Sequence, residues 1–197
     1  MGRVNLDRVK RRRRPAGAAG RGRWAWVLAL WAALAGAAVG RDPFTHFFYQ
    51  SFGDLREEAE AARASGQVGL LVMFDDDECP WCHKMKTTIL NQPQVQDYTR
   101  RHFRPIRIDT KGDQPIIDFR GREWLEKDFA FKVFRVRATP VFLFLGLDGT
   151  LRYRHTGIVR DTREFLWLID YVAQGHYRSK KFPVYKRERR AGGRSPG

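Results

Sequence analysis

Apolar residues recur along the chain at two spacings, which predict an alternation of strands and helices. Continuous apolar runs at residues 68–74 and 141–145 predict buried central strands, because such strands are covered on both faces. Segments 103–109 and 151–155 alternate apolar and polar residues and predict two further strands, the second after a hairpin turn at 147–150. Helical spacing of apolar residues predicts four helices, at residues 54–64, 83–101, 122–134 and 162–174. The order of these elements indicates an α/β domain.

Three segments interrupt this pattern. Pro93 lacks a backbone N–H group and predicts a kink within the helix at 83–101. The polar segment 110–121 predicts a surface insertion. The aromatic-rich segment 43–52 predicts side chains that pack at the edge of the core.

The first forty residues have the composition of an export signal. Residues 1–23 are rich in arginine, and residues 24–39 carry no charge and consist mostly of Ala, Leu and Trp. A basic leader, an apolar stretch of this length and a small-residue exit are typical of a secretory signal rather than of a buried core helix. The apolar segment is short for a full membrane span of about 20 residues. It is therefore either a cleaved signal peptide or an uncleaved anchor in the inner membrane, and both predict a periplasmic or otherwise extracytoplasmic domain after Arg41.

The formal net charge of +15 is concentrated at the two ends of the chain. Residues 1–40 carry +8 and residues 178–197 carry +7, which together account for all of it, so the segment between them is neutral. A nucleic-acid-binding domain concentrates basic residues on its folded surface, so we expect no nucleic-acid partner. The expected organisation is a signal or anchor at 1–40, one domain at 41–178 and a basic, disordered tail at 179–197, with binding of the tail to anionic lipid as the alternative.

Cys79 and Cys82 are the only cysteines of the chain, and they lie between the apolar run at 68–74 and a predicted helix. A Cys-x-x-Cys pair in this setting is typical of a thiol/disulfide redox site. Free N–H groups and the dipole at a helix start stabilise a thiolate at the first cysteine. We therefore expect Cys79 to attack and Cys82 to resolve, with their disulfide as the redox group and no metal or other cofactor. Trp81 is expected to present an aromatic face to substrates.

Other interpretations of the cysteine pair stay open at this point. A structural disulfide across two residues would restrict the unfolded chain little, and a zinc site needs two further ligands. Together with His83 the pair matches the Cys-x-x-Cys-His pattern of covalent haem attachment, as in a c-type electron carrier, although the buried strand before it favours a redox site. A glutaredoxin-like site and a non-catalytic, membrane-tethered binding module are the remaining alternatives.

The chain resembles the thioredoxin superfamily over residues 44–178. Besides the cysteine pair, the resemblance rests on Ala138, Thr139 and Pro140 before the apolar run at 141–145. It implies a thioredoxin fold with a central four- or five-stranded mixed sheet flanked by helices. It also implies a cis peptide bond at Pro140 beside the cysteines, with the backbone of Thr139 free to bind an extended substrate.

Within the superfamily, the chain looks most like exported thioredoxin-like proteins of bacterial sulfur-oxidation gene clusters. The matching segments are 79–85, 108–110, 137–141 and 171–177, followed by Phe182 and Tyr185. This resemblance implies an extracytoplasmic thiol:disulfide reductase that acts on substrate proteins with disulfides. It also implies a membrane thiol transporter as the electron donor.

The residues before the cysteines depart from cytosolic thioredoxin. That family has a buried Asp six residues before the first cysteine, where this chain has Met73. The three Asp residues at 75–77 indicate a solvated strand exit, with one of them as an alternative proton relay. Four carboxylates up to Glu78 should oppose thiolate formation at Cys79, which favours a reductase or a moderate exchanger. His83 is expected either to tune the thiolate or to lie exposed on the helix.

Overall fold

The computed structural model describes residues 39–192. The predicted signal or anchor at residues 1–40 lies almost entirely outside these residues, as does the end of the predicted tail from residue 193. No helix within the described range is long and apolar enough to cross a membrane.

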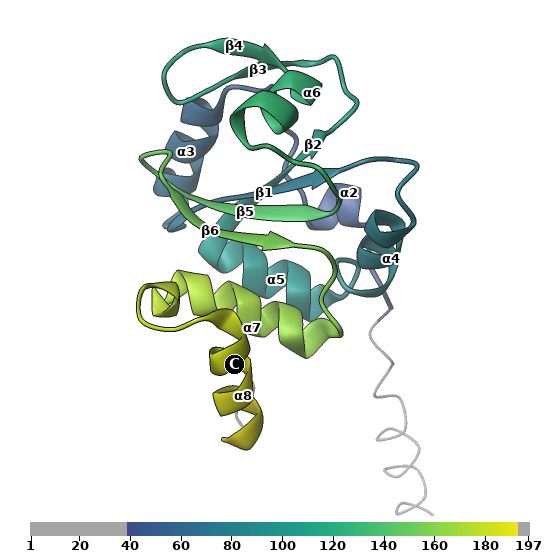
Figure 1. The fold of residues 1–197 in the computed structure, drawn as a ribbon, viewed down its shortest axis with the longest axis vertical. Coiled ribbons are helices and arrows are strands. Elements are labelled where there is room, and N and C mark those ends of the chain that lie inside the picture. Colours follow the sequence, from purple (N-terminus) through teal and green to yellow (C-terminus); the bar gives the residue numbers. More distant parts are fainter. Residues whose placement is uncertain (1–38, 193–197) are drawn as a thin grey trace, which may run out of the picture. The chain divides into compact units, whose positions relative to one another are not determined.

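A mixed four-stranded sheet forms the centre of the domain (Figure 1). Its strands lie in the order β2 (Phe103–Asp109), β1 (Gly69–Asp75), β5 (Val141–Gly146) and β6 (Leu151–Thr156). β1 is parallel to β2 and antiparallel to β5, and β5 is antiparallel to β6. The predicted mixed sheet is therefore confirmed, with four strands. A separate two-stranded ribbon is formed by β3 (Pro115–Ile117) and β4 (Glu123–Leu125).

Helices cover both faces of the sheet (Figure 1). α3 (Leu55–Ala64) and the ribbon lie on one face, and α5 (Pro93–His102) and α7 (Thr162–Ala173) lie on the other. Asp54 and Asp161 cap α3 and α7, because their side chains accept hydrogen bonds from N–H groups of the first turn. The remaining helical segments are α2 (Pro43–His46), α4 (Pro80–Thr88), α6 (Glu126–Asp128), a π-helix (Phe129–Val133), a 3-10 turn (His176–Arg178) and α8 (Phe182–Ala191).

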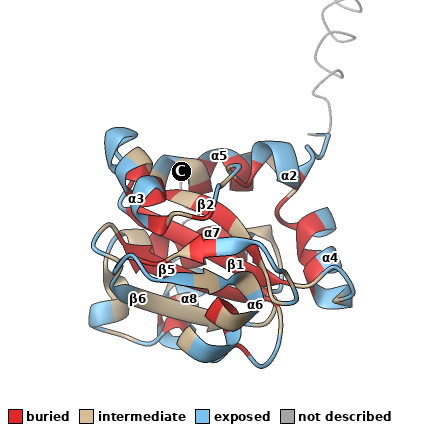
Figure 2. Ribbon diagram, turned by 90° about the horizontal axis from the view of Figure 1, so that it is seen from above, coloured by how far each residue is buried: buried red, intermediate tan, exposed pale blue. Residues whose placement is uncertain are grey.

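Alternation along the central strands gives the domain a hydrophobic core on each side of the sheet. Leu71 and Met73 of β1 belong to the core under α5 and α7. The intervening residues Leu70, Val72 and Phe74 belong to the core under α3 and the ribbon. Figure 2 shows how the buried residues concentrate in the central strands and α7. Because β1 is covered on both faces, its residues 69–74 are all apolar.

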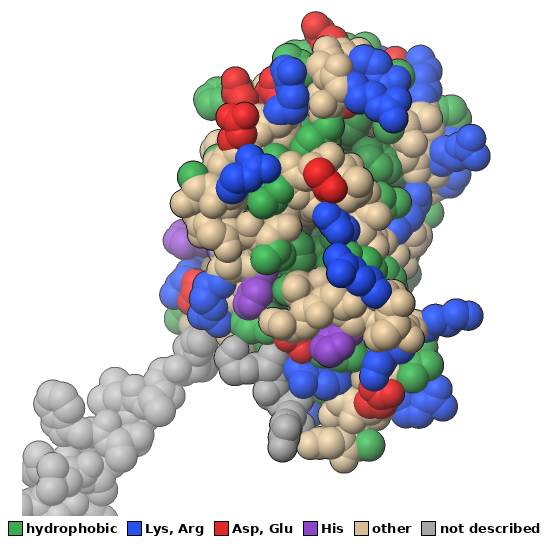
Figure 3. All heavy atoms as spheres, turned by 90° about the vertical axis from the view of Figure 1, so that its left-hand side faces the viewer, with side chains coloured by type: hydrophobic (Ala, Val, Ile, Leu, Met, Phe, Trp, Pro, Cys, Tyr) green, Lys and Arg blue, Asp and Glu red, His purple; other side chains and the backbone are tan. Residues whose placement is uncertain are grey.

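Charged side chains of both signs share the surface of the domain. On the face shown in Figure 3, Lys and Arg side chains are interspersed with Asp and Glu. Ion pairs such as Arg122 with Asp118 at 2.8 Å and Arg152 with Asp148 at 3.3 Å recur over the described residues. This mixture follows from the neutral composition of residues 41–177.

The predicted helix at 83–101 is two helices in the structure. α4 ends at Thr88, and Pro93 occupies the first turn of α5. The first turn of a helix leaves its N–H groups without partners inside the helix, so proline is tolerated there but not in the interior. The prediction of a kink was therefore wrong, because the proline begins a new helix.

The predicted insertion at 110–121 and helix at 122–134 also differ from the structure. Residues 115–125 form the β3–β4 ribbon, and the helical part is confined to residues 126–133. In the turn of the ribbon, Asp118 accepts hydrogen bonds from the backbone N–H of Arg122 at 3.0 Å and the indole N–H of Trp124 at 3.1 Å. Such side-chain contacts favour a turn over a helix, and helical spacing alone could not reveal them.

The prediction of a disordered tail at 179–197 is wrong for residues 182–191, which form α8. Phe182 and Tyr185 are three positions apart, and both are buried. Asp170 of α7 accepts hydrogen bonds from the side chains of Tyr98, Tyr185 and Arg189. These contacts hold α8 against α7, so the domain extends beyond the predicted boundary at residue 178.

Candidate functional site

The cysteine pair lies at the junction of β1 and α4. β1 ends at Asp75, and Cys79 is the N-cap residue of α4. Cys79 Sγ accepts a hydrogen bond from the backbone N–H of Cys82 at 3.1 Å. The sulfur therefore takes the position that an Asp or Ser oxygen usually fills at a helix start, where free N–H groups point toward it.

The two thiols differ in exposure and acidity. Both cysteines are free thiols, and Cys82 is buried while Cys79 is partly exposed. Burial and a hydrogen bond with Cys79 raise the pKa of Cys82 to about 12. Cys82 is therefore protonated at neutral pH, and Cys79 is the thiol that a substrate can reach.

The pKa of Cys79 lies below its ordinary value. Burial raises the pKa of this thiol, but hydrogen bonds from the Cys82 side chain and from the backbone N–H groups of Cys82 and Trp81 lower it by more. Such donors stabilise the thiolate, which is the nucleophilic form. Cys79 therefore ionises more readily than Cys82, and the roles of an attacking Cys79 and a resolving Cys82 stay a prediction.

Thr139 and Pro140 lie beside Cys79, although 60 positions separate Cys79 from Thr139. The peptide bond between them is cis, as the resemblance implied. The Cys79 thiol donates a hydrogen bond to the Thr139 carbonyl at 3.5 Å. Pro140 is buried, whereas Trp81 is 54% exposed. The partly exposed sulfur therefore lies between a backbone segment and an aromatic side chain that an extended peptide can approach.

Comparisons with known proteins agree with this geometry. Residues 55–173 match the protein family described as Thioredoxin-like domain. The chain belongs to the thioredoxin-like family. The matched segment includes both cysteines, Pro140 and α7, and it ends before α8.

The solved structures that resemble this thioredoxin-like protein include the following two. A DsbH oxidoreductase is 16% identical, with a TM-score of 0.52, and the match covers 74% of this chain and 98% of that chain. A thioredoxin-fold protein from Helicobacter pylori is 19% identical, with a TM-score of 0.50, and the match covers 64% of this chain and 82% of that chain. At these identities the similarity shows the fold alone. The search of curated proteins gave no match, and the narrower resemblance to sulfur-oxidation proteins stays a prediction.

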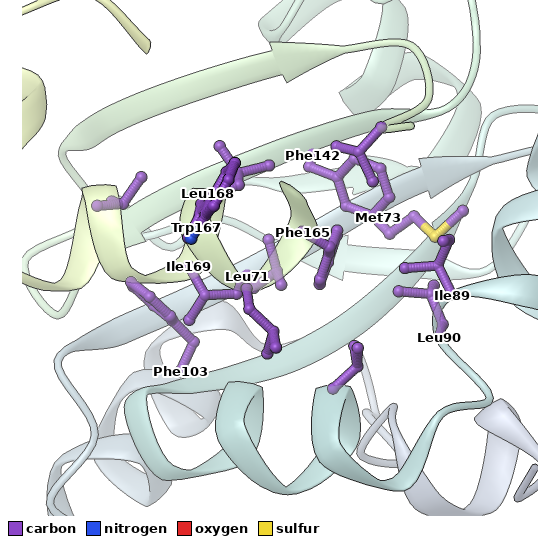
Figure 4. Close-up of a cluster of buried hydrophobic side chains, with 14 of the residues drawn as sticks. Leu71, Met73, Ile89, Leu90, Phe103, Phe142, Phe165, Trp167, Leu168 and Ile169 are labelled. Atoms are coloured by element: carbon purple, nitrogen blue, oxygen red, sulfur yellow. The ribbon is translucent and has the colours of Figure 1, made fainter. Parts of the chain in front are cut away.

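Asp75 does not lie at a solvated strand exit, so that prediction is wrong for this residue. Its side chain is fully buried, because β1 continues through it and alternation places it on the same face as Met73. Met73 packs on that face near Phe142 (Figure 4). The Asp75 carboxylate accepts hydrogen bonds from Lys86 Nζ at 2.9 Å and Arg107 Nε at 2.5 Å. These two cations offset the cost of burying the carboxylate.

The other carboxylates of the acidic run are paired as well. Lys111 Nζ lies 3.0 Å from Asp76 and 2.5 Å from Glu78. Arg107 also contacts Asp77, at 2.7 Å. The cations neutralise most of the local negative charge, so the acidic run opposes thiolate formation at Cys79 less than its sequence predicted.

His83 is exposed in the first turn of α4, which agrees with one of its two predicted interpretations. It lines a cleft of about 550 Å³ with Phe44 and Lys86. Covalent haem attachment requires both sulfurs of a Cys-x-x-Cys-His motif to be accessible to the haem. Because Cys82 is buried, the geometry argues against the haem interpretation.

Lys86 and Arg107 were not among the predicted site residues. Lys86 lies one turn after Cys82 on the buried side of α4. Lysine is almost never buried without a partner, so its position on that side was a signal for a nearby carboxylate. Arg107 belongs to β2 and reaches Asp75 through the pairing of β1 with β2. The contact between Arg107 and Asp75 could not be predicted from their spacing along the chain.

Proposed function

We propose that this thioredoxin-like protein catalyses thiol:disulfide exchange with other proteins through Cys79 and Cys82. The observation that carries the proposal is the position of Cys79 Sγ, between the N–H of Cys82 and the carbonyl of Thr139. At this position the Cys79 thiol has a lowered pKa and is partly exposed, and the second thiol, Cys82, lies one turn further along α4.

The exchange proceeds in two steps, and the cysteine pair supplies both electrons. The Cys79 thiolate attacks one sulfur of a substrate disulfide, forms a mixed disulfide and releases the other substrate sulfur as a thiolate. Cys82 then transfers its proton to the departing sulfur and attacks Cys79 Sγ, which releases the second substrate thiol. The substrate gains two electrons, and the protein is left with a Cys79–Cys82 disulfide.

We propose that the protein works as a reductase. A strong oxidant of this fold has an attacking cysteine with a pKa far below the ordinary value. At Cys79, burial counteracts the hydrogen bonds that stabilise the thiolate. We therefore expect a reduction potential closer to that of thioredoxin, about −270 mV, than to that of DsbA, about −120 mV.

The proposed location is outside the cytoplasm, on the basis of the basic leader and the apolar segment 24–39. In this proposal the apolar segment is a signal peptide or a membrane tether, the substrates are exported proteins with disulfides, and a membrane thiol transporter restores the reduced pair. Segments 79–85 and 171–177 favour sulfur-oxidation chemistry as the setting, because they carry the resemblance to that group.

Reduction of insulin by the full chain tests the proposal. We expect the wild-type protein to accelerate insulin precipitation by dithiothreitol, and Cys79→Ser to abolish the acceleration. Equal rates for the two proteins would refute the proposal and favour a binding module without catalysis. Equilibration with glutathione buffers then measures the reduction potential, and a value near that of DsbA would reverse the proposed direction.

A further inference from the structure

A cavity of about 450 Å³ lies beside α4. One of its lining residues, Lys186, lies outside the segment that matches the family. Met85 of α4 and Ile89, which follows α4, line one side, and residues 158–160 after β6 line another. Glu164 of α7 and Lys186 of α8 also belong to the lining. Because the family match ends at residue 173, α8 is an addition of this chain to the matched segment.

Backbone hydrogen bonds connect this cavity to the redox centre. Cys79 Sγ contacts the carbonyl of Thr139, and the carbonyl of the next residue, Pro140, accepts a hydrogen bond from the N–H of Gly157 at 2.8 Å. Ile158 follows Gly157 and begins the cavity wall. On the other side, Lys84 lines the cavity and its ammonium group lies 5.7 Å from the ring of Trp81. The cavity wall is therefore joined to the segment that contacts the reactive sulfur, and Lys84 of the lining lies near Trp81.

The added helix is fixed in place. Phe182 and Tyr185 are buried, and the Tyr171 hydroxyl donates a hydrogen bond to the carbonyl of Lys180 at 2.6 Å, just before α8. On the cavity side, Glu164 of α7 pairs with Lys186 at 2.6 Å and with Arg190 at 3.4 Å. Lys186 is therefore held as part of the wall.

The chemistry of the lining is apolar inside and positive at the rim. Met85, Ile89 and Val159 are buried side chains that form an apolar floor. Lys84, Arg160 and Lys186 are the cationic members of the lining. The carboxylate of the lining, Glu164, is already bound by two cations. The rim thus has a surplus of positive charge, which is complementary to carboxylates.

We propose that this cavity binds a segment of the substrate protein next to its disulfide, in which an apolar side chain is flanked by Asp or Glu. In this proposal α8 and residues 158–160 determine which substrates are preferred. The inference rests on the proposed function, because the cavity acts on a substrate that is held at Cys79.

Two disulfide-linked peptides with the same apolar residue test the proposal, one with flanking Glu residues and the other with Gln in their place. We expect the reduced full chain to reduce the Glu peptide with a kcat/KM about tenfold higher at low salt, because several exposed cations each contribute a few-fold. The preference should fall as salt is raised, since exposed charges are screened.

Two pairs of matched variants test whether the cations of the cavity cause the preference for the Glu peptide. Arg160→Glu should lower the Glu/Gln ratio at least several-fold, whereas Arg120→Glu, an equal charge change in the β3–β4 ribbon, should leave it unchanged. Lys186→Gln should lower the ratio, and Arg187→Gln, at the next and exposed position of α8, should not.

The outcomes separate the two proposals. If both peptides are reduced at equal rates by the wild type, or if Arg160→Glu and Lys186→Gln keep the wild-type ratio, the cavity proposal is wrong and the proposed function survives. If neither peptide nor insulin is reduced, the proposed function fails and the cavity proposal fails with it.

Discussion

Asp75→Asn should destabilise the domain, because it removes the carboxylate that two buried or partly buried cations share. The Asp75 side chain has no exposure, and the side chains of Lys86 and Arg107 are 10% and 24% exposed. Breaking a buried ion pair by removing one partner costs about 3–5 kcal/mol. Here Asp77 remains 3.9 Å from Lys86 and 2.7 Å from Arg107, and offsets part of that loss. We therefore expect a loss of about 2–3 kcal/mol, which corresponds to a decrease in Tm of about 4–12 °C for a domain of this size.

A double-mutant cycle with Lys86→Met tests the physical reason for this loss. The double variant lacks both members of the Asp75–Lys86 pair, and Arg107 keeps its contact with Asp77. Its free energy of unfolding should therefore exceed the additive expectation by about 1–3 kcal/mol. Urea unfolding of the four reduced proteins, followed by far-ultraviolet circular dichroism, measures this coupling. Losses that add within about 0.5 kcal/mol would refute the reasoning, because residues that do not interact behave additively.

Three further predictions follow from individual side chains. Iodoacetamide should alkylate Cys79 with an apparent pKa below that of an ordinary cysteine thiol, because hydrogen bonds stabilise its thiolate, while Cys82 stays unreactive at pH 8. Equal reactivity would contradict the two pKa directions. Burial lowers the pKa of His155 below 6.5, so the unfolded chain binds its proton first and stability is lost as the pH falls below 6.5. His155→Asn should weaken that pH dependence of Tm. If Tm of the variant falls with pH as steeply as Tm of the wild type, His155 is not the cause of the pH dependence. Tyr185→Phe removes the hydrogen bond to the buried Asp170 carboxylate and should cost about 1.5–3 kcal/mol, with faster amide hydrogen exchange in α8. Unchanged exchange would show that this contact does not hold the helix.

The central strands and the cysteine site could be predicted because their signals are local. A strand covered on both faces is apolar throughout, as residues 69–74 are, and the redox motif occupies four consecutive positions at 79–82. The cis bond before Pro140 came from the resemblance and not from a physical pattern, since most X-Pro bonds are trans. The structure then places these separate signals next to one another.

The features that were missed depend on contacts between distant residues. The burial of Asp75 requires Lys86 from α4 and Arg107 from β2, and neither contact follows from the acidic run itself. In the same way, the composition of α8 predicts a basic, disordered tail. The helix forms because Phe182 and Tyr185 pack into the core beside α7. Local composition describes the exposed side of such an element, whereas a few buried side chains decide whether it folds.

The attack of Cys79 on a substrate disulfide is the central claim, and trapping of the mixed disulfide tests it most directly. Reduced Cys82→Ser and Cys79→Ser proteins are mixed with a disulfide-containing peptide and examined by intact mass under non-reducing conditions. We predict that Cys82→Ser accumulates a covalent adduct through Cys79, because the resolving thiol is absent, and that Cys79→Ser forms no adduct at neutral pH. An adduct through Cys82 in the Cys79→Ser protein, or none in Cys82→Ser, would contradict the account.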